Sequence, residues 1–287
     1  MTIDGKTRTC GLIGNPVEHT LSPVIHNTLA ERLGHNMVYV PFLVEEGRVA
    51  EAVKGAYALN LLGMNVTVPY KSEVIGSLKE IDPLAENIGA VNTLVRTEGG
   101  YKGYNTDMEG LYRAMESEGI RIKGEDIILL GAGGAARAVA YLCASKGAAT
   151  VYMLNRTIDK AQAVAGEVNR ATGAEVIVPM ALVDYGKLPD RQFLAIQGTS
   201  VGLFPNVEDV VIADREFYQK IHTGFDLIYS PWDTKFMQLV RENGGNAYNG
   251  LKMLLYQGII AYELWNDVRV SEEDAMIVYD KMKEHFA

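Results

Sequence analysis

Cysteine, clustered metal ligands and long hydrophobic runs are all scarce in this sequence. Its two cysteines, Cys10 and Cys143, are far apart in the chain, which excludes a disulfide-rich scaffold and indicates a reducing compartment. The five histidines are scattered rather than spaced as ligands, so we expect no metal site. No apolar segment approaches the ~18 residues that a transmembrane helix needs, and the short polar N-terminus lacks the pattern of a signal peptide. We therefore expect a cytoplasmic protein without a membrane partner.

Positive charge is scarce as well. The chain has 27 Lys and Arg residues against 36 Asp and Glu, a formal net charge of -9, and no basic run. Binding to a phosphate backbone requires clustered Lys and Arg, so we expect no nucleic-acid partner. A length of 287 residues is enough for about two domains.

A cofactor motif is present in residues 125–137. The apolar run 127–130 predicts a buried strand, which is followed by a glycine turn and the start of a helix. Gly131, Gly133 and Ala136 form the Gly-x-Gly-x-x-Ala pattern that is typical of dinucleotide binding. The first glycine allows a tight turn, the second lets the backbone approach a pyrophosphate, and the alanine lets helix and strand pack closely. The free N–H groups at the helix start would bind the phosphates.

The strand that follows indicates which dinucleotide is bound. It is expected at residues 150–154 and ends in Asn155-Arg156-Thr157. Sites that prefer NAD usually carry an acidic residue about 20 residues after the glycines, which binds the ribose 2′-hydroxyl. That acid is absent and Arg156 is nearby, and a guanidinium suits a 2′-phosphate. The sequence therefore predicts NADP, the alternative being that Arg156 is a solvated surface residue.

Strands and helices alternate along the chain. Strands are expected at 9–13, 37–44 and 61–68, separated by helices at 23–33 and 46–57, which is typical of a parallel βαβ layout. The same alternation recurs after the glycine motif, with a strand expected at 225–229 and a helix from Ser230, and predicts a doubly wound sheet there. The fold class is therefore α/β.

Several polar residues of the first part are candidate ligands. Ser22 and Pro23 suit the start of a helix, so capping is a sufficient explanation for Ser22, whereas nothing local explains Thr20. Two hydroxyls at a helix start can bind a carboxylate. Lys71 follows the strand expected at 61–68, and ligands bind at the carboxyl ends of parallel strands. A solvated surface lysine is the alternative.

Three further polar residues have both a structural and a functional explanation. Asn92 lies within the strand expected at 89–95, where its amide must be paired or face a ligand. Asp107 falls in the first turn of the next helix, where a carboxylate favours the helix dipole. Gln257 lies in a largely apolar helix expected at 250–267, and it could simply face solvent.

Taken together, these motifs resemble the shikimate dehydrogenase family, which includes close relatives that oxidise quinate. The matching stretches span nearly the whole chain: Gly14-Asn-Pro-x-x-His19, Leu21-Ser22-Pro23, His26-Asn27, Asn65-Val-Thr-Val-Pro-Tyr-Lys71, Gly89-Ala-Val-Asn-Thr93, Gly103-Tyr-Asn-Thr-Asp107, Gly131-Ala-Gly-Gly-Ala-Ala-Arg137, Asn155-Arg156-Thr157, Asp226-Leu-Ile-Tyr229 and Gly250-x-x-Met253-Leu-x-x-Gln257.

The resemblance implies an N-terminal α/β substrate domain plus a doubly wound Rossmann NADP-binding domain, with a cleft between them. The substrate-binding and catalytic domain would comprise residues 1–107 together with 250–287, and the dinucleotide domain residues 108–249. A small-molecule substrate and a monomer or homodimer are expected.

The resemblance also implies roles for individual residues. Lys71 and Asp107 match the catalytic pair. The residues that match substrate-binding positions are Thr20, Ser22, Asn65, Thr67, Asn92 and Gln257. Thr20 stands where many members have serine. The residues that match NADP-binding positions are Gly131, Ala132, Gly133, Gly134, Ala135, Ala136, Arg137, Asn155, Arg156, Thr157, Lys160, Tyr229 and Gly250.

The implied activity is reversible NADP-dependent reduction of 3-dehydroshikimate to shikimate, a step of chorismate and aromatic amino-acid biosynthesis. A hydride passes to C3, and Lys71 and Asp107 handle the proton. Burial would favour a neutral, basic Lys71, whereas the Asp107 carboxylate would favour its ammonium form. Lys71 could therefore move the proton, or stay charged and stabilise an alkoxide. The alternatives are a quinate dehydrogenase that uses NAD or NADP, and a dinucleotide sensor that has lost the chemistry.

Overall fold

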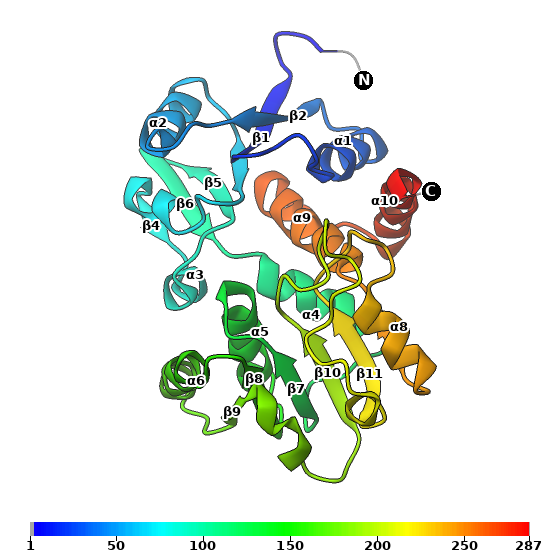
Figure 1. Cartoon of the computed structure of the whole chain (residues 1–287). Helices are drawn as coiled ribbons and strands as arrows, with labels where there is room; N and C mark the ends of the chain where they lie inside the picture. The colour runs from blue at the N-terminus through cyan, green and yellow to red at the C-terminus, as the bar shows by residue number, and fades with distance from the viewer. Residues whose placement is uncertain (1–2, 287) are drawn as a thin grey trace. The chain divides into compact units, whose positions relative to one another are not determined.

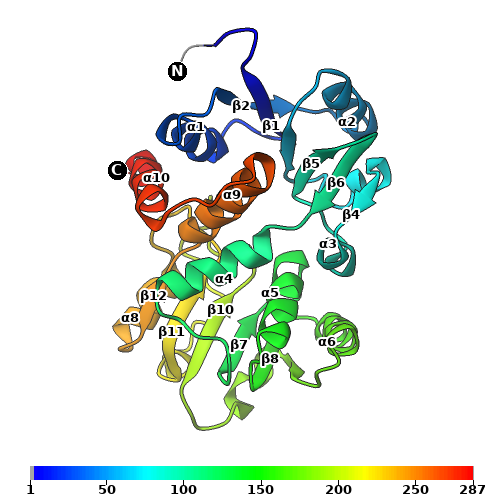
Figure 2. The ribbon, with the colours of Figure 1, turned by 180° about the vertical axis from the view of Figure 1, so that it is seen from behind.

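The computed structural model describes residues 3–286, which divide into two compact units. The first unit contains the residues up to Leu111 and those from Leu254 onward, and the second contains Tyr112–Met253. Both boundaries fall inside helices, α4 (Asp107–Ser117) and α9 (Leu251–Asn266). Figures 1 and 2 show the ribbon from opposite sides. Among the described residues, no helix is both long enough and apolar enough to cross a membrane.

The first unit contains a six-stranded mixed sheet in the order β2-β1-β3-β5-β6-β4. The strands are β1 (Arg8–Gly14), β2 (Met37–Leu43), β3 (Gly63–Val66), β4 (Glu80–Ile81), β5 (Thr93–Thr97) and β6 (Gly100–Tyr104). β1, β2 and β3 run parallel, but β5 runs antiparallel to both β3 and β6. The parallel layout expected for the strands at 9–13, 37–44 and 61–68 is therefore confirmed. The tight turn at Gly99, where φ is 78°, makes β5 and β6 a hairpin, and hairpin strands are antiparallel.

Helices cover both faces of this sheet, as Figure 1 shows for α2 on one side and α1 on the other. The first-unit helices are α1 (Ser22–Arg32), α2 (Val49–Ala58), α3 (Pro83–Ile88), α10 (Glu272–Lys283) and the short 3-10 turns η1 (Glu73–Ser77) and η3 (Glu284–Phe286). Val49 and Val53 of α2 pack with Met64 of β3 in one buried cluster. On the other face, Trp265 of α9 donates from Nε1 to the Leu94 carbonyl oxygen at 2.9 Å.

The second unit contains a six-stranded parallel sheet in the order β12-β11-β10-β7-β8-β9. The strands are β7 (Asp126–Leu130), β8 (Thr150–Asn155), β9 (Ile177–Ala181), β10 (Phe193–Gln197), β11 (Ile221–Asp226) and β12 (Asn246–Tyr248). The chain starts in the middle, builds outward to β9, returns to β10 and builds toward the other edge. This order confirms the doubly wound sheet.

Helices α5 (Gly134–Ser145) and α6 (Ile158–Thr172) pack beside β7, β8 and β9, as Figure 2 shows from behind. The remaining elements are α7 (Arg215–Tyr218), α8 (Lys235–Glu242) and the 3-10 turn η2 (Leu182–Lys187). A strand expected at 225–229 is wrong, because β11 ends at Asp226 and the next apolar residues leave the sheet. The helix expected from Ser230 instead begins at Lys235, after the Thr234 hydroxyl accepts from the Met237 backbone N–H at 3.3 Å.

Candidate active site

Lys71 and Asp107 are in direct contact in the first unit. Lys71 follows β3, Asp107 begins α4, and the Lys71 Nζ donates to Asp107 Oδ2 at 2.6 Å. The two side chains are 33% and 22% exposed, respectively. The lysine is therefore not a free surface charge. The contact provides a proton-carrying group with a fixed partner that a small molecule can still reach.

Asn92 holds the other oxygen of the Asp107 carboxylate. Its Nδ2 donates to Asp107 Oδ1 at 2.8 Å and lies 3.4 Å from Gln257 Oε1, and its Oδ1 accepts from the Thr106 backbone N–H at 2.8 Å. The mid-strand position expected for Asn92 is wrong, because sheet pairing begins at the next residue, Thr93. The amide is therefore paired within the protein, its partner is a candidate catalytic group, and its contact with a ligand stays a prediction.

Gln257 does not face solvent. Only 8% of the residue is exposed, and its Nε2 donates to the Leu254 carbonyl oxygen at 2.9 Å. The solvent-facing alternative is therefore wrong, because α9 turns this side of the helix toward Asn92 and α4.

At the start of α1, the Ser22 hydroxyl does not cap the helix, and the Thr20 hydroxyl has a local partner. The N-cap residue of α1 is Leu21 and no side chain caps the helix, so the prediction that Ser22 caps it is wrong. Thr20, which had no local explanation, accepts from the Ser22 backbone N–H at 3.2 Å and donates to Ser22 Oγ at 3.1 Å. Leu21 is itself in a helical conformation, which draws Ser22 into the first turn. Burial raises the pKa of Tyr39 well above its ordinary value, opposed by a hydrogen bond with the Ser22 side chain.

Asn65 and Thr67 flank the end of β3. Asn65 is buried within the strand, and its amide bonds to Tyr39, His26 and Thr93. Thr67 donates its backbone N–H to Ile13 at 2.9 Å and its carbonyl accepts from Tyr70 at 2.9 Å, which shapes the turn that leads to Lys71.

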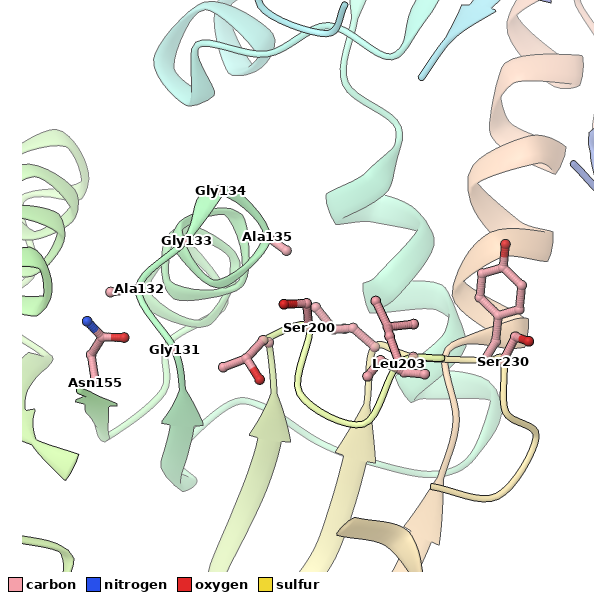
Figure 3. Close-up of a pocket in the computed structure, with 14 residues that line it drawn as sticks. Gly131, Ala132, Gly133, Gly134, Ala135, Asn155, Ser200, Leu203 and Ser230 are labelled. Carbon is pink, nitrogen blue, oxygen red and sulfur yellow. The ribbon is translucent and has the colours of Figure 1, made fainter. Parts of the chain in front are cut away.

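A cavity of about 610 Å³ lies in the second unit, at the carboxyl ends of its strands (Figure 3). Its lining residues are Gly131, Ala132, Gly133, Gly134, Ala135, Asn155, Gly198, Thr199, Ser200, Leu203, Leu227, Ile228, Tyr229 and Ser230. Figure 3 shows Asn155 on one side of the glycine turn and Ser200, Leu203 and Ser230 on the other. Seven of the thirteen residues predicted to bind NADP line this cavity, namely 131–135, 155 and 229.

The glycine turn has the shape that a dinucleotide requires. Gly131 has a φ of 109°, which favours glycine, and a Cβ there would stand 2.8 Å from Thr199 Cγ2. A Cβ at Gly133 or Gly134 would meet no atom within 4 Å, so the backbone faces open space. No side chain caps the N-terminus of α5, which leaves its first N–H groups available to an anion. The turn therefore fits a pyrophosphate.

Three of the predicted cofactor residues support the cavity from outside it. Ala136 is fully buried, and a Cβ on Gly198 would stand 3.2 Å from the Ala136 Cβ. Arg137 forms an ion pair with Glu167 of α6. Gly250 donates its backbone N–H to the Ile228 carbonyl oxygen at 3.0 Å and so holds a lining segment in place.

The remaining three lie at the end of β8 and the start of α6. Arg156, Thr157 and Lys160 are exposed, and Asn155 Nδ2 donates to the Thr157 carbonyl oxygen at 2.8 Å. Within residues 3–286, neither Arg156 nor Lys160 has an ion-pair partner. Two unpaired cations next to Asn155, which lines the cavity, fit a 2′-phosphate.

Two lining segments were not predicted. They are residues 198–200 and Leu203 after β10, and residues 227–230 after β11, apart from Tyr229. Buried polar side chains at the strand ends hold both segments. Gln197 Oε1 accepts from the Thr199 backbone N–H at 2.6 Å, and Asp226 Oδ1 accepts from the Ile228 backbone N–H at 2.9 Å. Both segments follow the carboxyl ends of strands near β7, where such sheets bind ligands, and this position could have identified them from the sequence.

Known proteins are similar to this chain over most of its length. Residues 12–94 match the family model described as shikimate dehydrogenase substrate binding domain, and residues 113–181 match the one described as shikimate / quinate 5-dehydrogenase. The chain is 42% identical over 265 residues to the shikimate dehydrogenase (NADP(+)) of Desulforamulus reducens, covering 92% of this chain and 91% of the relative.

Solved structures are similar over almost the full length. A shikimate dehydrogenase in complex with NADP+ has a TM-score of 0.87 at 36% identity, covering 98% of this chain and 97% of that one. The shikimate 5-dehydrogenase of Listeria monocytogenes, in complex with shikimate and NAD, has a TM-score of 0.90 at 29% identity and covers 98% of both chains.

Proposed function

This chain belongs to the shikimate dehydrogenase family, and we propose that it catalyses the reversible NADP-dependent reduction of 3-dehydroshikimate to shikimate with Lys71 and Asp107 handling the proton. It is an oxidoreductase, and its substrate is a small molecule. The observation that carries the residue assignment is the 2.6 Å contact between the Lys71 ammonium and a carboxylate whose other oxygen is held by Asn92.

The chemistry at Lys71 follows from this contact. NADPH supplies the hydride when it is bound. In reduction, the oxygen on C3 must gain a proton, and Lys71 Nζ is the donor nearest to Asp107. Asp107 holds the ammonium in place, and Asn92 stops the carboxylate from rotating away. In oxidation the same groups accept the proton from the hydroxyl.

The polar residues around this pair hold the substrate. Thr20 and Ser22, linked through their hydroxyls, bind its carboxylate at the start of α1. Thr67, Asn92 and Gln257 bind its ring hydroxyls. Asn65 was expected to do the same, but its amide already bonds to Tyr39, His26, Thr93 and the Asn92 carbonyl oxygen, so we propose that it supports Asn92 instead.

The glycine turn and its neighbours hold the cofactor. The N–H groups of Gly131–Ala135 and the start of α5 bind the pyrophosphate, and Arg156 and Lys160 bind the 2′-phosphate. Asn155, Thr157, Ala136, Arg137, Tyr229 and Gly250 complete or support this site.

Steady-state formation of reduced nicotinamide tests the proposal. Shikimate and quinate are each paired with NADP and NAD, and the absorbance of the reduced cofactor is followed. We expect turnover with shikimate and NADP and much less in the other three combinations. Equal or faster turnover of quinate would assign the chain to the quinate-oxidising branch. No turnover in any combination, with the cofactor still bound, would indicate a sensor.

We also propose that the enzyme works in the cytoplasm as a monomer or homodimer. Cys10 and Cys143 are free and buried, and burial raises the pKa of each thiol to about 12, which suits a reducing compartment. Light scattering of the purified protein tests the oligomeric state, and fractionation of cells tests the location.

A further inference from the structure

The Asn65 side chain forms as many hydrogen bonds as an amide can. Its Oδ1 accepts from the Tyr39 hydroxyl at 2.8 Å and is 3.1 Å from His26 Nε2, while its Nδ2 donates to the Asn92 carbonyl oxygen at 3.2 Å and to Thr93 Oγ1 at 3.1 Å. A carboxamide has two N–H donors and an oxygen with two lone pairs. The protein itself therefore fixes the orientation of this amide.

His26 can make this bond in only one tautomer. Because the Asn65 oxygen is an acceptor, the proton of the neutral imidazole must be on Nε2. Nδ1 is buried and has no hydrogen-bond partner among residues 3–286. Among these residues, the His26 ring therefore forms its hydrogen bond through the Nε2 N–H.

Packing fixes the imidazole ring. Its centroid lies 4.2 Å from that of Tyr39, with an interplanar angle of 20°, and 5.0 Å from that of Trp265. Gly258 of α9 packs closely against α1, since a Cβ there would stand 3.1 Å from Ile25 Cγ2 and 3.7 Å from His26 Nε2. Burial lowers the pKa of His26 to about 3, so the ring stays neutral over the working range of most enzymes.

The bonds beyond Asn65 lead to the proposed catalytic pair. Thr93 Oγ1 accepts from Asn65, so its own proton is available to Asn92 Oδ1, which lies 3.0 Å away. With its oxygen engaged on that side, Asn92 presents Nδ2 to Asp107 Oδ1 at 2.8 Å. All these groups belong to the first unit. Backbone groups favour the same orientations, since the Asn92 carbonyl oxygen accepts from Asn65 Nδ2 and the Thr106 backbone N–H donates to Asn92 Oδ1, and His26 Nε2 adds a donor on the Asn65 oxygen.

We infer that His26 is a positioning residue that acts through Asn65 and Thr93 to hold the Asn92 amide with its N–H groups toward Asp107. This inference rests on the proposed function, because it assigns Asp107 to the reaction. His26 contacts neither the substrate nor the proton that is transferred, and its effect is on the geometry of the groups that do.

Steady-state kinetics of His26→Leu, His26→Gln and His35→Leu test this assignment. Leucine removes the donor, glutamine restores an N–H, and His35 is a matched control in the same unit that bonds to Tyr262 instead. We expect His26→Leu to lower kcat/KM for shikimate roughly 10- to 100-fold, the range expected when a buried acceptor loses its partner. His26→Gln should recover most of the loss, and the KM for NADP should not change. Equal losses in His26→Leu and His35→Leu, or no recovery with glutamine, would overturn the inference.

A double-mutant cycle tests the route. If His26 acts through Asn65, then His26→Leu should cause less than about a twofold further loss in an Asn65→Ala protein. A full additional loss would show that His26 acts by another route and would refute the inference. Tyr39→Phe, with Tyr101→Phe as the matched loss of a buried hydroxyl, provides a milder pair if the leucine variant does not fold.

Nitrogen NMR of the His26 ring gives a readout that does not depend on activity. We expect the Nε2-protonated tautomer and no titration between about pH 5 and about pH 9. An Nδ1-protonated ring would overturn the inference even if the enzyme turns over shikimate. Conversely, the expected tautomer in a protein that oxidises no substrate would refute the proposed function and leave the hydrogen-bond assignment intact.

Discussion

Gly110 of α4 and Gln257 of α9 approach each other more closely than any other residue at position 110 would allow. A Cβ on Gly110 would stand 2.6 Å from the Gln257 backbone nitrogen and 2.8 Å from its Cβ. α4 carries Asp107 at its start, and α9 carries Gln257, which lies 3.4 Å from Asn92. The glycine therefore sets the spacing between two groups that converge on Asn92.

Replacing this glycine should damage both stability and activity. In Gly110→Ala the methyl group cannot fit without moving α9, and overpacking of this kind costs about 1–3 kcal/mol. We expect urea unfolding to report that loss, and kcat/KM for shikimate to fall. Gly166→Ala in α6 is the control, because its Cβ would meet only Arg170 Nη2 at 4.0 Å, and it should stabilise the protein by about 0.5–1 kcal/mol. Equal effects of the two substitutions would contradict the close approach.

The role of Lys71 predicts a specific kinetic signature. If its ammonium donates the proton or stabilises the developing charge, Lys71→Ala should lower kcat by about 100- to 10,000-fold while the KM for shikimate changes far less. Lys54→Ala, an exposed lysine of α2, should leave both constants unchanged. An unchanged kcat with a raised KM would make Lys71 a binding residue only.

The preference for NADP should depend on Arg156. Its guanidinium is exposed at the end of β8 and has no ion-pair partner among the described residues. A bound 2′-phosphate would therefore be its anionic partner. Loss of a charge-assisted hydrogen bond should raise the KM for NADP roughly 10- to 100-fold in Arg156→Ala and leave the KM for NAD unchanged.

Two further variants separate this effect from a general loss of charge. Lys160→Ala should act in the same direction but more weakly, because a lysine cannot bind a phosphate in the bidentate way of an arginine. Arg170→Ala, at the other end of α6, should have no effect. If Arg156→Ala weakens NADP and NAD equally, the arginine does not recognise the 2′-phosphate.

The sequence predicts best where local pattern decides the structure. The strand, glycine turn and helix over residues 127–137 follow from a short apolar run and from the φ that Gly131 needs, and the structure confirms both. The same kind of reasoning failed at Ser22, because helix capping also depends on the conformation of Leu21. It failed again at 225–229, because an apolar run that lines a cavity has the same composition as a strand.

Contacts between residues far apart in the chain could not be predicted from local sequence patterns. The bond between His26 and Asn65 joins residues 39 positions apart, and its geometry depends on how α1 packs on the sheet. The contact between Asn92 and Gln257 spans 165 positions. Periodicity and capping rules describe neighbours in the chain, so they cannot predict such pairs. The roles of individual residues in binding and catalysis stay predictions until the variants are measured.

The stability of the second unit should depend on pH through Asp226. This carboxyl is fully buried at the end of β11, and burial raises its pKa from 3.8 to about 7, opposed by hydrogen bonds from the Thr234 hydroxyl and the Ile228 backbone N–H. Between about pH 4 and about pH 7 the folded protein keeps this proton and the unfolded chain has lost it. The contribution of Asp226 to stability is therefore full below its unfolded pKa and is lost as the pH rises toward 7.

Asp226→Asn removes this dependence because the amide does not ionise. The free energy of unfolding of the variant, minus that of the wild type, should rise with pH across this window by at most about 1.4 kcal/mol per pH unit, and should level off above about pH 7. Urea unfolding at intervals from about pH 5 to about pH 8 measures the difference. Asp209→Asn, at an exposed position, should give a constant difference. A constant difference for Asp226→Asn would mean that the carboxylate is already ionised in the folded protein, with its hydrogen bonds from Ile228 and Thr234 outweighing the cost of burial.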